Sequence, residues 1–291
     1  MSDGNQLIQC RHGRMLYHAK DAVIGRSLAY YGEYFESEVD VFRHYLGPGD
    51  VAVDAGANIG SHTLAMARLG GPRGRVLAFE PQRLVFQTLC ANMALNDITC
   101  ADCHWLALAA DDGDVWVPEP DLRVPANHGG VAVSHDGGGQ RVEGRALDGV
   151  FQESRLKLMK ADVEGMELAL ILGAAETLRR FRPVLYLEND RVEHSPALLS
   201  TLSRLGYDCH WHLPRFHNPD NFNHQVEPLH PCGFTERGGG RLGSIGFAVN
   251  MLCVPAGDAV PGLPGLLAVQ DEDEHPYLRH CLPRFAPVVA G

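Results

Sequence analysis

The sequence lacks the features of a membrane protein and of a nucleic-acid-binding protein. No stretch approaches the roughly 18 consecutive apolar residues that a membrane span requires. No basic stripe is visible, and the formal net charge of −11 disfavours nucleic acid as a partner, because phosphate binding needs concentrated lysine and arginine. The segment Met1–Gln6 has neither the basic nor the apolar region of a secretory signal. We therefore expect a cytoplasmic protein with no membrane span and no nucleic-acid partner.

The sequence also lacks the ligand spacing of a zinc site. Its eight cysteines are scattered along the 291 residues, and we expect them to be free thiols. Cys100, Cys103 and His104 match the spacing of covalent haem attachment, but that chemistry usually requires export. We interpret the two cysteines as an incidental pair.

Most of the chain alternates short apolar strands with helical patterns. Strands are predicted at 51–53, 76–79, 104–109, 156–160, 184–187, 207–212 and 247–254. Helices are predicted at 34–46, 61–69, 82–95 and 196–205, with another directly after Asp162. This alternation predicts an α/β fold with a doubly wound, seven-stranded and mostly parallel sheet of the Rossmann-like kind.

Acidic residues stand at the ends of four predicted strands. They are Asp54, Glu80, Asp162 and Glu188. Because sites on such sheets form at the carboxyl ends of the strands, we expect four carboxylates to face one crevice. A single acid at this place is often only a cap on the following helix, but four in corresponding positions favour a site.

The turn after the first sheet strand indicates which nucleotide this crevice binds. A dinucleotide site needs G-x-G-x-x-G, whereas this turn reads Asp54-x-Gly56-x-x-x-Gly60 with Asn58 between the glycines. An acid at position 54 repels a pyrophosphate but suits a ligand with an ammonium group. S-adenosylmethionine carries an ammonium and a sulfonium and has no phosphate, and Glu80 can accept hydrogen bonds from both ribose hydroxyls. The turn therefore favours S-adenosylmethionine over NAD.

Several segments in this order resemble the FkbM-type methyltransferases, within the class I fold of S-adenosylmethionine-dependent enzymes. The resemblance covers roughly residues 20–255, and Ala161 departs from it, since isoleucine is more common there. The segments that carry it are 53–63 (Val-Asp-Ala-Gly-Ala-Asn-Ile-Gly-Ser-His-Thr), 78–81 (Ala-Phe-Glu-Pro), 127–130 (Asn-His-Gly-Gly) and 160–167 (Lys-Ala-Asp-Val-Glu-Gly-Met-Glu), followed by Arg182-Pro183.

The resemblance implies a domain organisation and an activity. A methyltransferase domain would cover residues 50–255, with inserts at 110–150 and 213–245. An N-terminal strand and helix extension (1–49) and a Pro-rich C-terminal tail (256–291) would flank it. The implied reaction is O-methylation of a hydroxyl on a sugar, glycan or natural product, and we expect the 213–245 insert to set the choice of acceptor.

The resemblance also implies roles for single residues around the methyl donor. Asp162 would lie beside the sulfonium and the acceptor. The position of Glu164 in the first helical turn after Asp162 leaves two roles open: it caps or shapes the crevice, or it interacts with the helix dipole. The remaining residues implied in donor binding are Asp54, Gly56, Asn58, Gly60 and Thr63 around the methionine end, Glu80 and Pro81 at the ribose, and Ala107 at the adenine.

Methyl transfer to a hydroxyl also needs a way to remove its proton, and two remain open. A general base is the first, with Asp162, Glu188 or a histidine as candidates, of which His194 is the best placed. A divalent metal such as Mg²⁺ is the second, held by Asp162, Glu188 and Asn189. Two other functions stay as alternatives: an NAD-dependent oxidoreductase, and a cofactor-binding module without catalysis.

Overall fold

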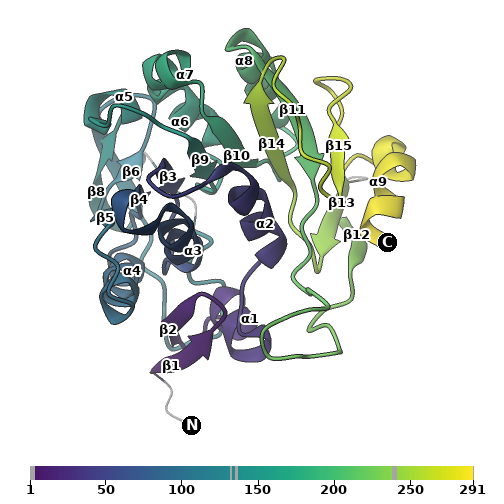
Figure 1. Ribbon diagram of the computed structural model, residues 1–291. Coiled ribbons are helices and arrows are strands. Elements are labelled where there is room, and N and C mark those ends of the chain that lie inside the picture. Colours follow the sequence, from purple (N-terminus) through teal and green to yellow (C-terminus); the bar gives the residue numbers. More distant parts are fainter. Residues whose placement is uncertain (1–3, 132, 135–136, 238–240, 291) are drawn as a thin grey trace.

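Eight strands form the central sheet of the computed structural model, which describes residues 4–131, 133–134, 137–237 and 241–290. Their order is β15-β11-β14-β10-β9-β3-β4-β5 (Figure 1). Strands β5, β4, β3, β9, β10 and β11 share one direction, and β14 and β15 run antiparallel to it. The bounds are β3 Val51–Ala55, β4 Arg75–Phe79, β5 Ala101–His104, β9 Leu158–Ala161, β10 Val184–Glu188, β11 Tyr207–His212, β14 Asn250–Pro255 and β15 Leu266–Ala268.

The predicted fold class is confirmed, but the central sheet has eight strands where seven were expected, and one predicted strand is misplaced. The strand expected at 104–109 ends at His104 in the central sheet. Ala107–Leu108 (β6) instead joins a separate three-stranded sheet with β7 (Gly113–Val117) and β8 (Gln140–Arg145), which the 110–150 insert supplies. The apolar pattern is continuous across both strands, so the sequence does not mark the break between them.

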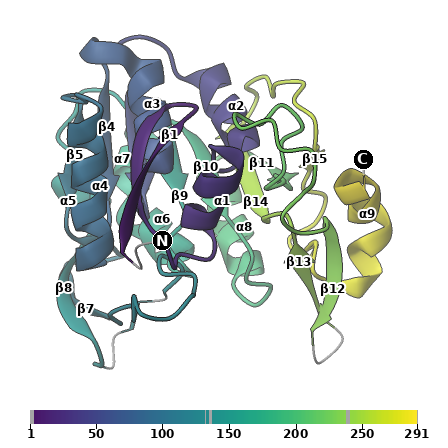
Figure 2. The same ribbon diagram turned by 90° about the horizontal axis from the view of Figure 1, so that it is seen from below.

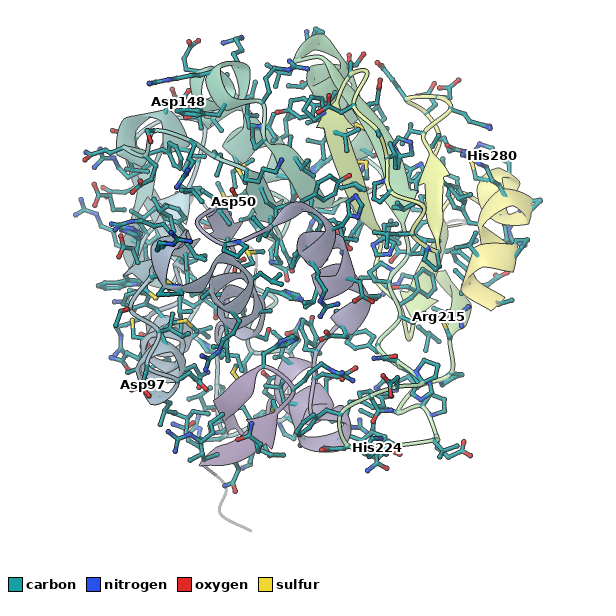
Figure 3. All side chains as sticks on the ribbon, viewed as in Figure 1. Asp50, Asp97, Asp148, Arg215, His224 and His280 are labelled. Carbon is teal, nitrogen blue, oxygen red and sulfur yellow. The ribbon has the colours of Figure 1, made fainter. Side chains whose placement is uncertain are left out.

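Helices cover both faces of the central sheet, because alternate side chains of each strand point to opposite faces. Ala52 packs against α2 (Glu36–Tyr45) and α3 (Ser61–Gly70), and α4 (Arg83–Leu95) lies on the same face. Val53 faces the opposite core, together with α6 (Glu167–Gly173), α7 (Ala175–Phe181) and α8 (Ser195–Arg204). The short helices η1 (Gly71–Arg73) and α5 (Leu147–Val150) follow α3 and β8. Asp148 in α5 accepts the backbone N–H groups at the start of α7 (Figure 3).

The turn between β3 and α3 depends on left-handed backbone angles. Gly56, Asn58 and Gly60 have φ values of 72°, 51° and 88°. Glycine adopts such angles without strain and asparagine tolerates them, so the turn is tight without a third glycine. A Cβ on Gly56 would overlap the carbonyl oxygen of Asp162, so the turn lies against the end of β9.

The N-terminal extension packs on the α3 and α4 side of the sheet. It forms a hairpin of β1 (Asn5–Cys10) and β2 (Gly13–His18), followed by α1 (Ile24–Tyr31) (Figure 2). Asn92 of α4 accepts the backbone N–H of Leu16 and donates to the same residue's carbonyl. The extension is thereby tied to the domain beside the β3–α3 turn.

The predicted C-terminal tail is instead part of the core. Residues 256–291 supply β15 at the edge of the central sheet, then η2 (Arg279–Cys281) and α9 (Leu282–Ala290). Phe285 is fully buried, and its ring meets that of Trp211 on β11. Proline content suggested an extension because it weakens strand and helix signals, but the apolar residues between the prolines pack onto the sheet.

The 213–245 insert carries its own hairpin, β12 (Gly233–Arg237) and β13 (Arg241–Ile245), which leads into β14. All eight cysteines are free thiols. No helix among the described residues has the length and apolar character needed to cross a membrane.

Candidate active site

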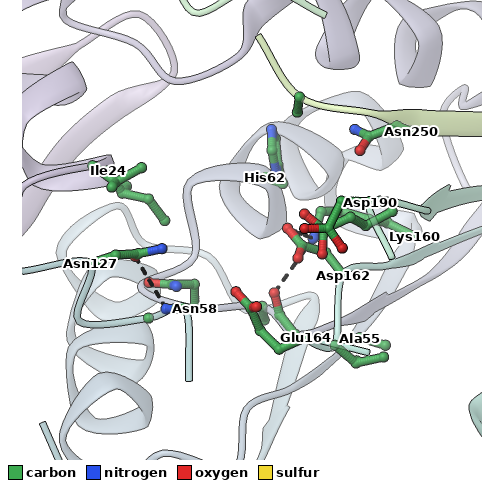
Figure 4. Close-up of a pocket in the computed structure, with 18 of the residues that line it drawn as sticks. Ile24, Ala55, Asn58, His62, Asn127, Lys160, Asp162, Glu164, Asp190 and Asn250 are labelled. Atoms are coloured by element: carbon green, nitrogen blue, oxygen red, sulfur yellow. Dashed lines mark hydrogen bonds and ion pairs between the residues drawn. The ribbon is translucent and has the colours of Figure 1, made fainter. Parts of the chain in front are cut away.

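A cavity of about 410 Å³ opens at the carboxyl ends of the parallel strands (Figure 4). This volume lies in the range of small-molecule and cofactor sites. Of the residues given a role from the sequence, eight line it: Gly56, Asn58, Glu80, Pro81, Ala107, Asp162, Glu164 and Glu188. The expected crevice therefore exists, and three of the four predicted carboxylates face it.

Glu80 is held rigidly where β4 ends. Its two carboxylate oxygens accept the backbone N–H of Asn58 at 2.9 Å and of Gln82 at 2.8 Å. Burial raises the pKa of Glu80 to about 7, although these two hydrogen bonds act to lower it. The amide of Asn58 is therefore occupied by a carboxylate, at the place where a dinucleotide-binding turn would present an amide to phosphate.

Asp54 does not line the cavity. The residue is fully buried in β3, and its carboxylate accepts a hydrogen bond of 2.6 Å from the hydroxyl of Thr63. Gly60 is also behind the cavity wall, where a Cβ would press on Leu89. Direct contact of Asp54, Gly60 and Thr63 with a ligand was expected from their place in the motif, but the structure gives them a supporting position.

Lys160 on β9 lies between Asp54 and Asp162. Its ammonium is 3.5 Å from the carboxylate of Asp54 and 3.6 Å from that of Asp162. It also donates a hydrogen bond to the carbonyl oxygen of Gly56 at 3.4 Å. Burial acts to lower the pKa of Lys160, but the nearby carboxylates outweigh it and keep the pKa above its ordinary value. The charged lysine thus fixes Asp162 at the cavity wall. In the sequence, Lys160 stands out as a lysine inside an apolar strand, but no role was predicted for it.

Further acids gather around Asp162 on the cavity wall. Figure 4 shows Asp162, Glu164 and Asp190 in the same part of the cavity, with Lys160 next to them. Burial and then the charge of Asp162 raise the pKa of Glu188 well above its ordinary value, and burial raises that of Glu164 to about 7. The cavity therefore holds carboxyl groups whose ionisation burial and mutual repulsion disfavour.

The metal site predicted from Asp162, Glu188 and Asn189 does not fit the structure. Asn189 is buried outside the cavity, where its side-chain amide donates to Ser195 at 2.9 Å. The described residues contain no group of three or more histidine, cysteine, aspartate or glutamate side chains arranged to hold a metal ion. The cation that accompanies Asp162 is the ammonium of Lys160.

The structure does not bring His194 to the cavity. This residue is exposed at the N-cap of α8, and the cavity lining does not include it. Among the described histidines, the lining contains His62. His224 of the 213–245 insert lies at the periphery of the molecule (Figure 3).

Glu167, at the start of α6, has a structural role. Its carboxylate accepts the backbone N–H groups of Val163 and Gly165 at 3.1 and 3.2 Å. These bonds shape the turn that carries Asp162 and Glu164.

Three of the polar cavity residues that sequence reasoning missed form one group. They are Glu38 on α2, His62 on α3 and Asn250 on β14. Asn250 donates to Glu38 at 2.9 Å, and His62 lies 3.6 Å from the second oxygen of the same carboxylate. The signal for Glu38 was a glutamate on the apolar face of a helix, between Phe35 and Phe42.

Aromatic side chains from distant segments of the chain also line the cavity. The rings of Phe35 and Phe216 lie 4.1 Å apart, which joins the N-terminal extension to the 213–245 insert. Tyr277 donates its hydroxyl to Ser244 at 2.8 Å, which joins the C-terminal segment to β13. The insert, predicted to border the acceptor, therefore does form part of the cavity wall.

Comparison with known proteins gives a family match. The profile of the methyltransferase FkbM domain matches residues 54–209. The matched stretch starts at Asp54, at the β3–α3 turn, and ends within β11. The α2 helix, the β12–β13 hairpin and the C-terminal segment lie outside it.

Two curated fungal proteins resemble this chain over part of its length. Methyltransferase 1 of Beauveria bassiana is 29% identical over 142 residues, which cover 42% of this chain and 57% of that protein. Methyltransferase sdnD of Sordaria araneosa is 31% identical over 156 residues, which cover 43% and 60%. The match thus spans well under two thirds of either relative.

Among solved structures, the methyltransferase FkbM from Methylobacillus flagellatus is similar to this chain. The TM-score is 0.41 with 15% sequence identity, and the match covers 74% of this chain and 50% of that one.

Proposed function

The chain belongs to the FkbM methyltransferase family, and we propose that it transfers a methyl group from S-adenosylmethionine to a hydroxyl of a sugar, glycan or natural product. The observation that carries this proposal is the charge of the cavity. Its wall presents Glu80, Asp162 and Glu188, and the amide of Asn58 at the glycine turn is already bonded to Glu80. A cationic ligand without phosphate suits this wall, whereas the pyrophosphate of NAD would meet carboxylates and no free amide at that place.

The residues present fit a nucleoside methyl donor. Glu80 offers a fixed carboxylate for the ribose hydroxyls, and Ala107 with its neighbours Leu106 and Leu108 offers an apolar surface for the base. When bound, S-adenosylmethionine supplies a methyl group on a positively charged sulfur. We call the part of the cavity formed at β3, β4 and β9 the donor half.

We assign removal of the acceptor's proton to Asp162 and Glu188 as a pair. Both line the cavity, and the charge of Asp162 is one cause of the raised pKa of Glu188. A carboxylate with a raised pKa is a stronger base than an ordinary glutamate, which favours proton removal from the acceptor.

The rest of the cavity supports a ring-bearing acceptor. Tyr34, Phe35, Phe216, Phe247 and Tyr277 line it, and they offer flat apolar surfaces close to the carboxylates. Aromatic faces beside polar groups suit a sugar or a cyclic natural product. We call this aromatic side the acceptor half.

Calorimetric titration tests the donor assignment. We expect S-adenosylmethionine and S-adenosylhomocysteine to bind with micromolar affinity, and NAD to give no heat. Transfer of labelled methyl to a panel of glycans and cyclic natural products then tests the reaction, with Asp162→Asn as the matched variant. We expect this variant to bind S-adenosylhomocysteine and to lose at least about a hundredfold in transfer rate.

Saturation by NAD without binding of S-adenosylmethionine would instead support the oxidoreductase. Tight donor binding, with no transfer to any hydroxyl and no effect of Asp162→Asn on cofactor breakdown, would support a binding module.

A further inference from the structure

A buried pair of polar side chains in the cavity has no role in the reaction described above. His62 is 5% exposed, and its Nε2 atom has no hydrogen-bond partner among the described residues. The rings of Tyr34 and Phe42 lie 5.6 and 5.5 Å from the imidazole ring and flank it. Leaving a buried ring nitrogen without a partner costs free energy, so its orientation into a ligand cavity indicates a missing partner.

Glu38 is the other member of the pair. It is 3% exposed, and one carboxylate oxygen accepts the side-chain N–H of Asn250 at 2.9 Å. The other oxygen is 3.6 Å from His62 Nε2, which is too long for a hydrogen bond. Burial raises the pKa of Glu38 to about 8, although Lys160 acts to lower it. The charge of this carboxylate is therefore poorly compensated by its protein partners.

The pair lines the same cavity as the donor half. His62 is the second residue of α3, directly beyond Ser61, which also lines the cavity. Backbone N–H groups in the first turn of a helix lack intrahelical partners and favour an anion. One carboxylate, one imidazole nitrogen and one helix start therefore meet at the same end of the cavity.

This combination is complementary to a zwitterion with an ammonium and a carboxylate on one carbon. We propose that Glu38 and His62 hold the amino-acid end of the methyl donor, with Glu38 accepting from its ammonium and His62 donating to its carboxylate. The proposal rests on the proposed function. It replaces Asp54, whose carboxylate is buried behind the wall and already bonded to Thr63. It also assigns part of donor recognition to α2, outside the stretch that the family profile matches.

Two ligands that differ only in this end of the donor test the proposal. S-adenosylhomocysteine carries the amino-acid end, and 5′-methylthioadenosine lacks it but keeps the nucleoside and the sulfur. We expect calorimetry to show that Glu38→Gln and His62→Ala each lower the affinity for S-adenosylhomocysteine at least tenfold. Both variants should bind 5′-methylthioadenosine within about twofold of the wild type.

Glu36→Gln is the matched control. Glu36 lies on the same helix, is 6% exposed and is bonded to His12 and Arg43, and it does not line the cavity. We expect this control to leave the affinity for both ligands unchanged. His62→Gln, which keeps an N–H donor, should recover part of the affinity for S-adenosylhomocysteine.

The outcomes separate this proposal from the proposed function. If the wild type binds neither ligand, both the proposed function and this assignment are wrong. If the wild type binds both, but Glu38→Gln weakens them equally or leaves both unchanged, only the assignment to Glu38 and His62 is wrong. A loss of transfer rate without any loss of affinity would show that the pair acts on the acceptor instead.

Discussion

The two halves of the cavity are built in different ways. The donor half comes from the family-matched stretch, and backbone contacts hold it, such as the two amides on Glu80 and the approach of Gly56 to β9. The acceptor half comes mainly from segments before residue 54 and after residue 209. Side-chain contacts between distant parts of the chain hold it, such as Phe35 with Phe216 and Tyr277 with Ser244.

This difference in construction suggests that the two halves of the cavity tolerate sequence change to different extents. A backbone cradle tolerates little change, because each bond and each close approach fixes the chain itself. An acceptor wall of side chains on a hairpin and a C-terminal segment can change while the sheet stays the same. His275, which is buried and bonded to the carbonyl of Asn189 at 2.9 Å, anchors that segment to the end of β10.

The largest expected effect comes from glycine substitutions in the two halves. Gly56 has φ of 72°, and a Cβ there would meet the backbone of Asp162, whereas a Cβ on Gly233 of β12 would meet no atom within 4 Å. We expect Gly56→Ala to lower the free energy of unfolding by about 3 kcal/mol or more. Gly233→Ala should change it by less than about 0.5 kcal/mol. Urea denaturation of both variants measures the difference, and equal effects would contradict the rigid donor half.

The parts of the fold that the sequence predicted are those with local signals. The strands and turns at β3, β4, β9 and β10 were placed within two residues, because apolar runs followed by an acid are visible in any short window. The C-terminal segment was not predicted, because β15 is only three residues long and pairs with β11, which is distant in the sequence. Proline-rich composition also hid the apolar positions of α9.

The same distinction explains which site residues were found. Glu80 and Asp162 directly follow strands and Glu188 ends one, so topology alone places them at one edge of the sheet. Asp54 follows the same rule in sequence, but it is still inside β3 and points to α3. Glu38 and His62 meet only because α2 and α3 pack side by side, and no pattern within either helix shows that contact.

A smaller effect is expected when one polar group is changed in each half of the cavity and the affinity for S-adenosylhomocysteine is compared. We expect Glu80→Gln to lower the affinity for S-adenosylhomocysteine about tenfold to a hundredfold. The glutamine amide has one acceptor fewer for the ribose hydroxyls, and it turns an N–H group toward a backbone N–H donor. Tyr277→Phe also removes one polar group, the hydroxyl bonded to Ser244, but from the acceptor half. It should leave this affinity within about twofold. Calorimetry on both variants tests this, and a comparable loss in Tyr277→Phe would mean that the halves are not independent.

The smallest expected effect is a dependence of donor affinity on pH. Burial is the main cause of the raised pKa values of Glu38, about 8, and of Glu80 and Glu164, about 7 each. Since these carboxyl groups titrate near 4.5 when unburied, the ligand-free protein binds more protons than the unfolded chain between about pH 4.5 and 8. Its stability should therefore fall as the pH rises through that window.

A cationic donor favours the ionised carboxylates, so its binding should release protons and strengthen as the pH rises from 6 to 8. We expect a gain of about threefold to tenfold for S-adenosylmethionine, because one released proton gives at most tenfold per pH unit. S-adenosylhomocysteine, which has the ammonium but no sulfonium, should gain less. Titrations in buffers with different ionisation enthalpies count the protons released. Proton uptake, or an equal gain for the two ligands, would show that the acids around Asp162 do not respond to the charge on sulfur, and the donor half would then recognise shape and hydrogen bonds without charge.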